Sequence, residues 1–346
     1  MKHGIAAALA ALTLAACGSS QPPAGSPPHH TADGYQNLYP FHQPGLGDIL
    51  RWRWEEWTGP EVVQRPERIP RVQPDLAWLA ANRSTASYTW LGHASGLLQL
   101  GGQNVLIDPI FSERVSPVQW LGPRRYLPVP ATLAQLPRID VVLISHNHVD
   151  HLDRDSIDAL LAQPGGQPQF VVPLGIDTWL RDRGATRITA LDWWQSADLG
   201  GLQYTATPAQ HWSKRSLTDT NETLWAGWAV KGQGKTVWYS GDTGYQQALF
   251  TDIGRRLGSI DLALLPVGAY LPRWFMASQH VDPLQSVQMF RDVKARQAVG
   301  IHWGVFALAS EAVDAPLDDL PAARRQLGVS EQAFRLLPLG GTLRLP

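Results

Sequence analysis

From about residue 86 onward, short apolar runs alternate with turn-forming residues, and this pattern predicts a domain built on β-strands. The predicted strands are 87–91, 96–100, 105–107, 140–145, 170–172, 187–191, 202–205, 224–231, 236–240, 262–265 and 298–302. Two segments have a helical pattern instead: residues 154–162 follow the N-cap candidate Asp153, and residues 283–293 follow Asp282. Strands mixed with scattered helices predict sheets that are covered by helices on their outer faces.

The N-terminus has a different pattern. Lys2 precedes an apolar run over residues 4–16 that is too short to span a bilayer, and small residues lead up to Cys17. This order is typical of a secretory signal peptide over residues 1–16. Residues 14–17 resemble a bacterial lipobox, which implies cleavage before a lipid-modified Cys17 and an anchor in the bacterial cell envelope, on the periplasmic side of the outer membrane. An ordinary signal peptide with a chance cysteine is the alternative.

Two further segments precede the strands. Residues 17–34 are rich in Gly, Ser and Pro and predict a flexible tether, in which the pair His29-His30 is expected to be solvated, with metal binding as the alternative. Residues 35–83 predict an arm packed on the domain with short helical turns. Its basic, aromatic stretch 51–54 is expected to pack as well, and contact with a membrane surface is the alternative. No internal linker or fixed-period repeat divides residues 84–346, which are taken as one domain.

Composition and charge exclude several classes of protein. The chain has 346 residues, of which 44% are hydrophobic, enough for a large core. Its net charge of -1 excludes the basic footprint of a nucleic-acid binder. The single cysteine excludes an internal disulfide framework and a thiolate-rich metal site. The triplet 234–236 resembles the end of a P-loop, but Ala229 stands where that motif needs glycine, so the triplet predicts a hairpin turn.

A dense group of metal-ligand residue types follows the apolar run 141–144. It contains His146, His148, Asp150 and His151. On an extended backbone, residues two apart point to the same side, so the first two histidines can face one metal ion. Asp150 and His151 lie where the chain turns towards a helix and can face a second position. Imidazole and carboxylate without thiolate suit zinc, and also manganese or iron.

Three more candidate ligands each lie after a predicted strand. They are His211, Asp242 in a Gly-Asp-Thr-Gly turn, and His302. Each of them alone has an ordinary structural explanation. Because loops at the carboxyl ends of several strands can converge, we expect the seven residues to form one metal site.

This combined pattern resembles the metallo-β-lactamase superfamily. The resemblance implies an α/β (α+β) fold, a four-layer αββα sandwich with a two-metal site at one edge. Longer segments within residues 86–310 resemble the N-acyl-phosphatidylethanolamine-hydrolysing phospholipase D family. These segments are 90–95, 108–112, 122–126, 192–194, 210–212, 268–276 and 302–304.

The resemblance also implies a ligand set for two zinc ions. His146, His148 and His211 would hold one ion, Asp150, His151 and His302 the other, and Asp242 would bridge them. Two cations about 3.5–4 Å apart can share a water and lower its pKa towards ~7. The resulting bridging hydroxide would attack the phosphorus of a phosphodiester while the metals offset the developing charge.

The implied activity is phospholipase D-type hydrolysis of N-acyl-phosphatidylethanolamine or a related phospholipid. Superfamily relatives also include lactonases, so a lactonase or a small-molecule phosphodiesterase on the same dinuclear site is the alternative. A non-catalytic envelope protein is a third hypothesis, which the intact set of seven ligands disfavours. The expected partners are a phospholipid substrate and a membrane reached through lipidated Cys17, with no nucleic acid. The oligomeric state is left open, with a homodimer among the alternatives.

Other polar residues near these motifs have weaker assignments. Asp150 is expected to accept a proton from the bridging water. His280 would contact the substrate phosphate, protonate the leaving group, or serve the structure alone. His93 is expected to orient a metal ligand, and Asp108 to form a buried turn. Three arginines are candidates for lipid-headgroup contacts or ordinary structural residues: Arg124, Arg125 and Arg273.

Overall fold

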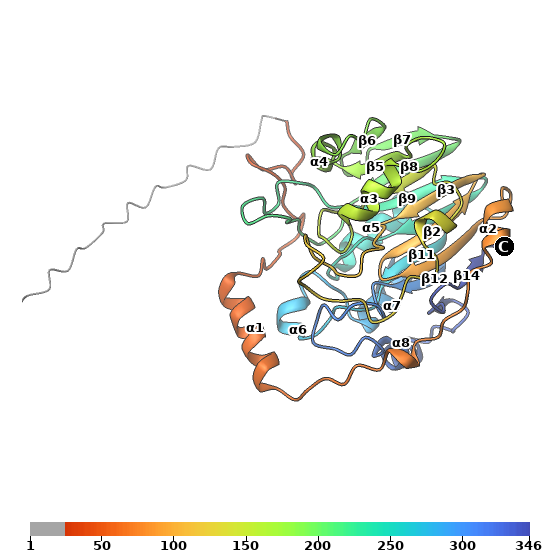
Figure 1. Ribbon diagram of the computed structural model, residues 1–346. Coiled ribbons are helices and arrows are strands. Elements are labelled where there is room, and N and C mark those ends of the chain that lie inside the picture. Colours follow the sequence, from red (N-terminus) through yellow and green to blue (C-terminus); the bar gives the residue numbers. More distant parts are fainter. Residues whose placement is uncertain (1–24) are drawn as a thin grey trace, which may run out of the picture.

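The computed structural model describes residues 25–346 of the chain (Figure 1). The predicted signal segment 1–16 and the predicted lipidation site Cys17 lie outside the described residues. Within residues 25–346, none of the helices combines the length and the apolar character needed to cross a membrane.

Two seven-stranded mixed sheets form the centre of the molecule. The first has the order β14-β1-β2-β3-β4-β5-β6, and the second β13-β12-β11-β10-β9-β8-β7. The first sheet consists of β1 (Ser87–Gly92), β2 (Ser95–Leu100), β3 (Gln103–Ile107), β4 (Val141–Leu143), β5 (Gln169–Pro173), β6 (Ile188–Leu191) and β14 (Thr342–Arg344). The second consists of β7 (Ser196–Leu199), β8 (Leu202–Thr207), β9 (Gly227–Gly232), β10 (Lys235–Tyr239), β11 (Ile260–Pro266), β12 (Ala295–Ile301) and β13 (Phe334–Arg335). Strands β3 to β6 and β10 to β13 run parallel, and the other neighbours antiparallel.

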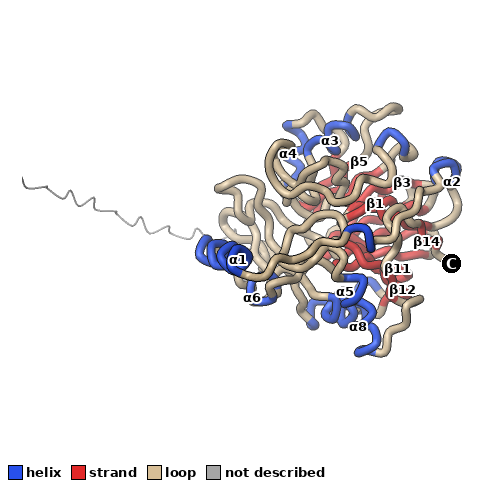
Figure 2. The backbone as a smooth tube through the Cα atoms, turned by 60° about the horizontal axis from the view of Figure 1, so that its bottom comes forward, coloured by secondary structure: helices blue, strands red, loops and turns tan. Residues whose placement is uncertain are grey.

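Helices cover both outer faces of the paired sheets (Figure 2). The first sheet packs against α2 (Leu76–Ala81), α3 (Arg154–Leu161) and α4 (Ile176–Asp182). The second packs against α5 (Gln247–Leu257), α7 (Pro283–Asp292) and α8 (Pro316–Leu327). The remaining helices are α1 (Leu46–Thr58), η1 (Pro66–Arg68), η2 (Leu133–Gln135) and α6 (Arg273–Met276). The architecture is the predicted four-layer αββα sandwich.

The two layers of the hydrophobic core follow from the alternation of side-chain directions along each strand. In β2, Leu97 packs under the helices while its neighbour Leu98 packs between the sheets. Large indoles fill the space between the sheets, and their N–H groups find acceptors: Trp228 donates to the carbonyl of Ile144 at 2.8 Å, and Trp238 donates to Thr207 at 3.0 Å. These buried donors are satisfied at the strand ends from which the candidate ligands emerge.

Several elements differ from the sequence-based predictions. The two predicted helices correspond to α3 and α7, but α4, α5 and α8 were not predicted. Helix α8 carries Pro321 inside it, which masks its helical character in the sequence. Strands β13 and β14 are two and three residues long, too short to show an alternating pattern. They are strands only because a neighbouring strand pairs with them.

The prediction of a solvated linker is wrong for His29. Its side chain is buried, with Nε2 at 2.6 Å from Asp192 Oδ1, and its ring stacks on Trp193 at 4.3 Å. His30 Nε2 lies 2.8 Å from the other oxygen of the same carboxylate. We call this group of His29, His30 and Asp192 the clasp, because it fastens the N-terminal segment to the end of β6. The sequence pattern missed it because its partners lie more than 160 residues apart.

The arm of residues 35–83 contacts the domain unevenly. Trp52 on α1 stacks on Phe275 at 5.0 Å and donates from Nε1 to Ser310 at 2.8 Å. Trp54 and Trp57 on the same helix stay mostly exposed, and α1 buries none of its residues. The predicted packing therefore describes one side of α1 and fails for the other.

Candidate metal centre

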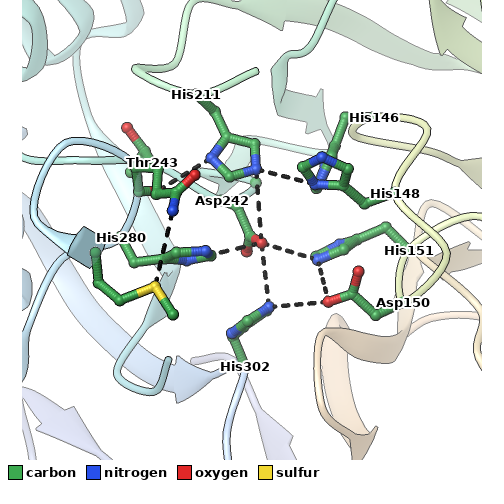
Figure 3. Close-up of polar contacts among 12 residues, drawn as sticks. His146, His148, Asp150, His151, His211, Asp242, Thr243, His280 and His302 are labelled. Carbon is green, nitrogen blue, oxygen red and sulfur yellow. Dashed lines mark hydrogen bonds and ion pairs between the residues drawn. The ribbon is translucent and has the colours of Figure 1, made fainter. Parts of the chain in front are cut away.

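The seven predicted ligands converge at one edge of the sandwich (Figure 3). Four come from the loop that follows β4 in the first sheet, and three follow β8, β10 and β12 in the second. The loop after β4 supplies His146, His148, Asp150 and His151; the second sheet supplies His211, Asp242 and His302. The site therefore lies where the carboxyl ends of strands from both sheets meet.

The first group of ligands consists of three imidazoles. His148 Nδ1 lies 2.8 Å from His146 Nε2 and 3.3 Å from His211 Nε2. Three ring nitrogens this close to one another form a compact set of lone pairs, which is the arrangement that holds one divalent cation.

The second group joins a carboxylate to two imidazoles. Asp150 Oδ2 lies 3.3 Å from His151 Nε2 and 3.4 Å from His302 Nε2. Asp242 Oδ2 lies 3.0 Å from His151, 3.1 Å from His302 and 4.0 Å from His211 Nε2. Asp242 therefore lies between the two groups (Figure 3), as a bridging ligand must.

Buried donor atoms without partners show that these residues fit metal ions. Asp242 Oδ1 is buried and has no partner, and His151 Nε2 and His302 Nε2, although 3.0 and 3.1 Å from Asp242 Oδ2, form no hydrogen bond with it. A polar atom left in this state costs free energy unless something binds it. Because the donors are nitrogen and carboxylate oxygen with no thiolate, zinc, manganese and iron fit them.

The electrostatics of the site keep its carboxylates ionised. Burial works against the charge of Asp150 and Asp242, but His151 beside both of them holds each carboxyl pKa well below its usual range. Burial also lowers the pKa of His148 to about 4, so this imidazole is neutral at pH 7. For His302 burial is outweighed by Asp242 and Asp150, which raise its pKa to about 9. A bound cation would replace the proton that these carboxylates attract to His302.

Hydrogen bonds behind the ligands hold their rings in place. Asp108 accepts from the backbone N–H of Ser145 at 2.7 Å, contacts His151 Nδ1 at 2.6 Å, and also accepts from the Tyr239 hydroxyl. His211 Nδ1 lies 3.0 Å from the carbonyl oxygen of Gln279. Asp108 was predicted as a buried turn former near the site, without its partners, and Tyr239 was not singled out, because an Ile-Asp-Pro triplet and a strand tyrosine carry no local sign of a common partner.

The backbone at the site is strained. His93, Asp108 and His302 have φ values of 50°, 36° and 61°, in the left-handed region that non-glycine residues rarely occupy. The N–H of His302 donates to the carbonyl of His93 at 2.9 Å, and a Cβ on Gly268 would lie 2.2 Å from the carbonyl of His302. Such strain persists only where packing enforces it and often accompanies function.

Two further histidines lie beside the seven. His93 Nε2 is 2.9 Å from Asp150 Oδ2, the contact that its predicted orienting role requires. His280 Nδ1 is 3.9 Å from Asp242 Oδ2, and burial lowers the pKa of His280 to about 4. Both imidazoles are therefore part of the same cluster rather than separate surface features.

The three candidate arginines have different environments. Arg125 is buried and donates to the carbonyls of Ile110 at 2.5 Å and Ser112 at 2.9 Å, so it supports a loop. Arg273 donates to the carbonyl of His280 at 2.9 Å and thereby holds the segment that presents this histidine. Arg124 is exposed and pairs with Glu113 at 3.4 Å.

The N-terminal arm also reaches the site. Asn37 forms two hydrogen bonds with the backbone of His211: its Oδ1 accepts from the N–H at 3.0 Å, and its Nδ2 donates to the carbonyl at 2.7 Å. Gln210 donates to the carbonyl of Pro40 at 2.9 Å. The arm thus fixes the loop that carries a candidate ligand, a contact across 174 residues that no sequence motif announces.

A four-layer αββα sandwich with a His/Asp cluster at its strand ends defines the class of metal-dependent hydrolases. The chain matches the model of the β-lactamase superfamily domain over residues 103–303, and it belongs to this family. The predicted superfamily and its fold are thereby confirmed.

Known relatives agree with this assignment. Over 231 residues the chain is 40% identical to N-acyl-phosphatidylethanolamine-hydrolyzing phospholipase D 1 of Caenorhabditis elegans. The match covers 64% of this chain and 65% of the nematode protein, which is just under two thirds of that protein's length. An uncharacterised protein of Mycobacterium tuberculosis is 38% identical over 328 residues, covering 93% of this chain and 85% of the relative. The solved structure of Igni18, a metallo hydrolase of Ignicoccus hospitalis, superposes with a TM-score of 0.56 at 22% identity, covering 76% of this chain and 99% of that one, and shows the shared fold.

Proposed function

We propose that this protein is a phosphodiesterase of the phospholipase D type that hydrolyses N-acyl-phosphatidylethanolamine or a related phospholipid with two zinc ions. The observation that carries the proposal is the 40% identity to the nematode N-acyl-phosphatidylethanolamine-hydrolyzing phospholipase D 1, which extends over 231 residues. The identical positions extend well beyond the seven candidate ligands, so the similarity to this relative is not limited to a shared metal site.

In this proposal the ligand roles follow the two groups. The three imidazoles of the first group would hold one ion, the carboxylate and two imidazoles of the second group would hold the other, and Asp242, which lies between the groups, would be shared by both. When bound, the ions supply Lewis acidity and a water of lowered pKa. Asp108 keeps the ring of His151 turned towards the cluster through the contact at 2.6 Å.

Asp150 and His280 have different tasks. The pKa of Asp150 lies well below its usual range, so its carboxylate is a good ligand and a weak proton acceptor at pH 7. His280 is neutral at pH 7 because burial lowers its pKa to about 4, and its Nδ1 is buried without a hydrogen-bond partner. A neutral imidazole with an unused ring nitrogen suits a hydrogen bond to a substrate phosphate oxygen better than it suits the delivery of a proton.

A lipid panel tests the proposed activity. Purified protein with measured metal content is incubated with N-acyl-phosphatidylethanolamine, phosphatidylethanolamine and phosphatidylcholine, and the products are separated. We expect phosphatidic acid and N-acylethanolamine, and their loss on chelation with recovery on adding zinc. The proposal is wrong if no metal-dependent release of a headgroup occurs with any lipid. Faster turnover of a lactone or a soluble diester than of any lipid would favour the alternative.

We also propose that the chain is anchored in the bacterial cell envelope through lipidated Cys17. The support is the lipobox-like stretch that ends at this residue. Expression in bacteria with a labelled fatty acid tests it: label should enter the wild-type chain and be absent from Cys17→Ser, which should also leave the membrane fraction. Equal labelling of both chains would refute the anchor.

A further inference from the structure

The outward side of α1 is apolar and exposed. Leu46, Leu50, Trp54 and Trp57 follow one another at intervals of four, four and three residues, so they line one side of the helix. Their exposed fractions are 73%, 62%, 61% and 76%. We call these four residues the α1 stripe. Scattered apolar side chains are normal on a protein surface, but a continuous stripe of this kind marks an interaction site.

The opposite side of α1 contacts the domain through a few specific side chains, although it buries none of its residues, so the exposure of the stripe does not come from a detached helix. Trp52 stacks on Phe275, and Trp274 of α6 donates to Glu55 at 2.8 Å. The guanidinium of Arg51 lies 4.0 Å from the centre of the Trp274 ring. Both views show α1 on the outside of the molecule next to α6 (Figures 1 and 2).

Every acidic side chain on α1 has a polar partner close by. Glu55 accepts from Arg51 at 2.8 Å, and Glu56 accepts from Arg53 at 2.8 Å. Asp48 lies 3.2 Å from His42 Nε2. Both glutamates are therefore paired with arginines, and the helix offers aromatic and aliphatic side chains flanked by arginine, which is typical of helices that lie in a membrane interface.

Helix α1 also lies on the side of the molecule from which the chain leads back towards the proposed anchor (Figure 1). The described chain begins at residue 25, and Figure 1 shows this end and α1 on the same side. Cys17 is eight residues earlier, a distance of at most about 29 Å even for fully extended chain. On its other side α1 packs on α6, from which the chain leads within four residues to His280 in the cluster.

We propose that the α1 stripe binds the surface of a phospholipid bilayer, with its leucines and tryptophans entering the boundary between headgroups and acyl chains. This inference rests on the proposed phospholipid substrate and adds where the enzyme meets it. A second copy of the chain is the competing occupant. A stable protein interface takes roughly 20–30 residues from each partner, whereas the stripe has four large side chains.

Labelling at a single cysteine tests the contact directly. In the full chain carrying Cys17→Ser, the substitution Leu50→Cys provides the only thiol for an environment-sensitive fluorophore. The control is Val72→Cys, at an exposed position whose backbone bonds to Leu339, away from α1. On adding phosphatidylcholine–phosphatidylglycerol vesicles, we expect a blue shift at position 50 and quenching by lipids brominated in the acyl chain, with neither effect at position 72.

Two outcomes of this experiment would overturn the proposal. One is unchanged emission at position 50 when the protein is bound to vesicles. The other is a blue shift that grows with protein concentration in the absence of vesicles, which would assign the stripe to a second copy of the chain.

Kinetics of a charged variant separate this inference from the proposed function. Trp54→Glu combined with Trp57→Glu should slow hydrolysis of vesicle-held substrate about tenfold or more, since two aromatic side chains no longer enter the lipid. Hydrolysis of the same lipid in detergent micelles should stay unchanged, as should both rates in Val72→Glu. Equal losses in both assays would contradict membrane docking. If the wild-type chain hydrolyses no phospholipid, the proposed function is wrong. The fluorescence experiment would still show whether the α1 stripe binds the bilayer.

Discussion

At the scale of single residues, the candidate centre depends most on Asp242. Its side chain is 2% exposed, its Oδ2 faces histidines of both ligand groups, and its Oδ1 has no hydrogen-bond partner. Histidines around it hold its pKa well below the usual range, although burial alone would raise it. A buried ionised carboxylate is stable only with positive charge beside it, which is what two cations would supply.

We expect Asp242→Asn to lose most of its bound metal and nearly all of its hydrolytic activity. The amide keeps the size of the side chain but removes the negative charge that both ions would share. Metal analysis by mass spectrometry and a turnover assay on the same sample check this. The control is Asp252→Asn, a half-buried carboxylate on α5 that pairs with Arg255 at 2.6 Å, outside the cluster. Wild-type metal content in Asp242→Asn would show that this residue does not bridge.

At this scale the sequence also carries its clearest local patterns. The types and spacing of the four ligands from His146 to His151 are local in sequence, so their proximity followed from strand and turn geometry. Asp108 and Tyr239 support the same site, but their shared contact joins β3 and β10, from different sheets. No pattern within either segment indicates such a contact.

At the scale of elements, the N-terminal segment acts as a brace for the site. The clasp fastens His29 and His30 to Asp192, and eight residues further on Asn37 bonds to both backbone groups of His211. The composition of residues 17–34 predicted a tether, since Gly, Ser and Pro cannot build a core. The imidazoles of His29 and His30 nevertheless contact the carboxylate of Asp192, and His29 also stacks on the indole of Trp193. Composition does not reveal contacts between residues so far apart in the chain.

We expect Asn37→Ala to weaken metal binding by the group of three imidazoles roughly tenfold, because the loop that carries His211 loses two hydrogen bonds. Competition with a chelator measures the affinity. The matched control is Gln36→Ala, the neighbouring residue, whose side chain donates to the carbonyl of Pro28 instead. If both variants bind metal like wild type, the arm does not support His211.

The clasp should open as the pH falls. Burial lowers the pKa of His29 below 6.5, so below that pH the opened segment binds more protons than the closed one, and acid favours opening. The carboxylate of Asp192 acts in the same direction near pH 4: burial is outweighed by its bond to His29, its pKa is lowered, and its stabilising contribution is lost on protonation.

Hydrogen exchange measures this opening. The backbone amide of Gln36 reports on the clasp, because it donates to the carbonyl of His29 at 2.8 Å. Between pH 7 and 5 the protection of this amide against exchange should fall, by no more than about tenfold per pH unit if one proton is linked to opening. Exchange is corrected for its intrinsic pH dependence. Asp192→Asn should show weaker protection throughout this range, and constant protection of the wild type would contradict the linkage.

At the scale of the whole molecule, the candidate centre joins the two sheets. The loop after β4 brings four ligands from the first sheet, and the ends of β8, β10 and β12 bring three from the second. Ions held by both sets would therefore cross-link the sandwich at one edge. The α1 stripe lies beside this edge and would orient the sandwich on a membrane.

Removal of metal should accordingly destabilise the protein. An ion present at a hundred times its Kd stabilises the folded state by about 2.7 kcal/mol. For a domain of this size, we expect chelation to lower Tm by about 5 °C or more and added zinc to restore it. Differential scanning calorimetry with and without chelator checks this, and Asp242→Asn should show a much smaller shift. An unchanged Tm in the wild type would argue against tightly held ions.

The sequence by itself determined the strand-rich domain and placed a candidate ligand after each of several predicted strands, whereas the four-layer class came from the resemblance to the metallo-β-lactamase superfamily. The first two properties depend on alternation of apolar residues and on ligand types spaced within short segments, and such patterns act locally. Only the tertiary structure decided that Asp242 lies between the two groups, that Asp108 holds His151, and that the N-terminal segment braces His211. It also decided which side of α1 is covered and which is left for a partner. These contacts join residues from 43 to 223 positions apart in the chain, and only close packing of the whole chain brings them together.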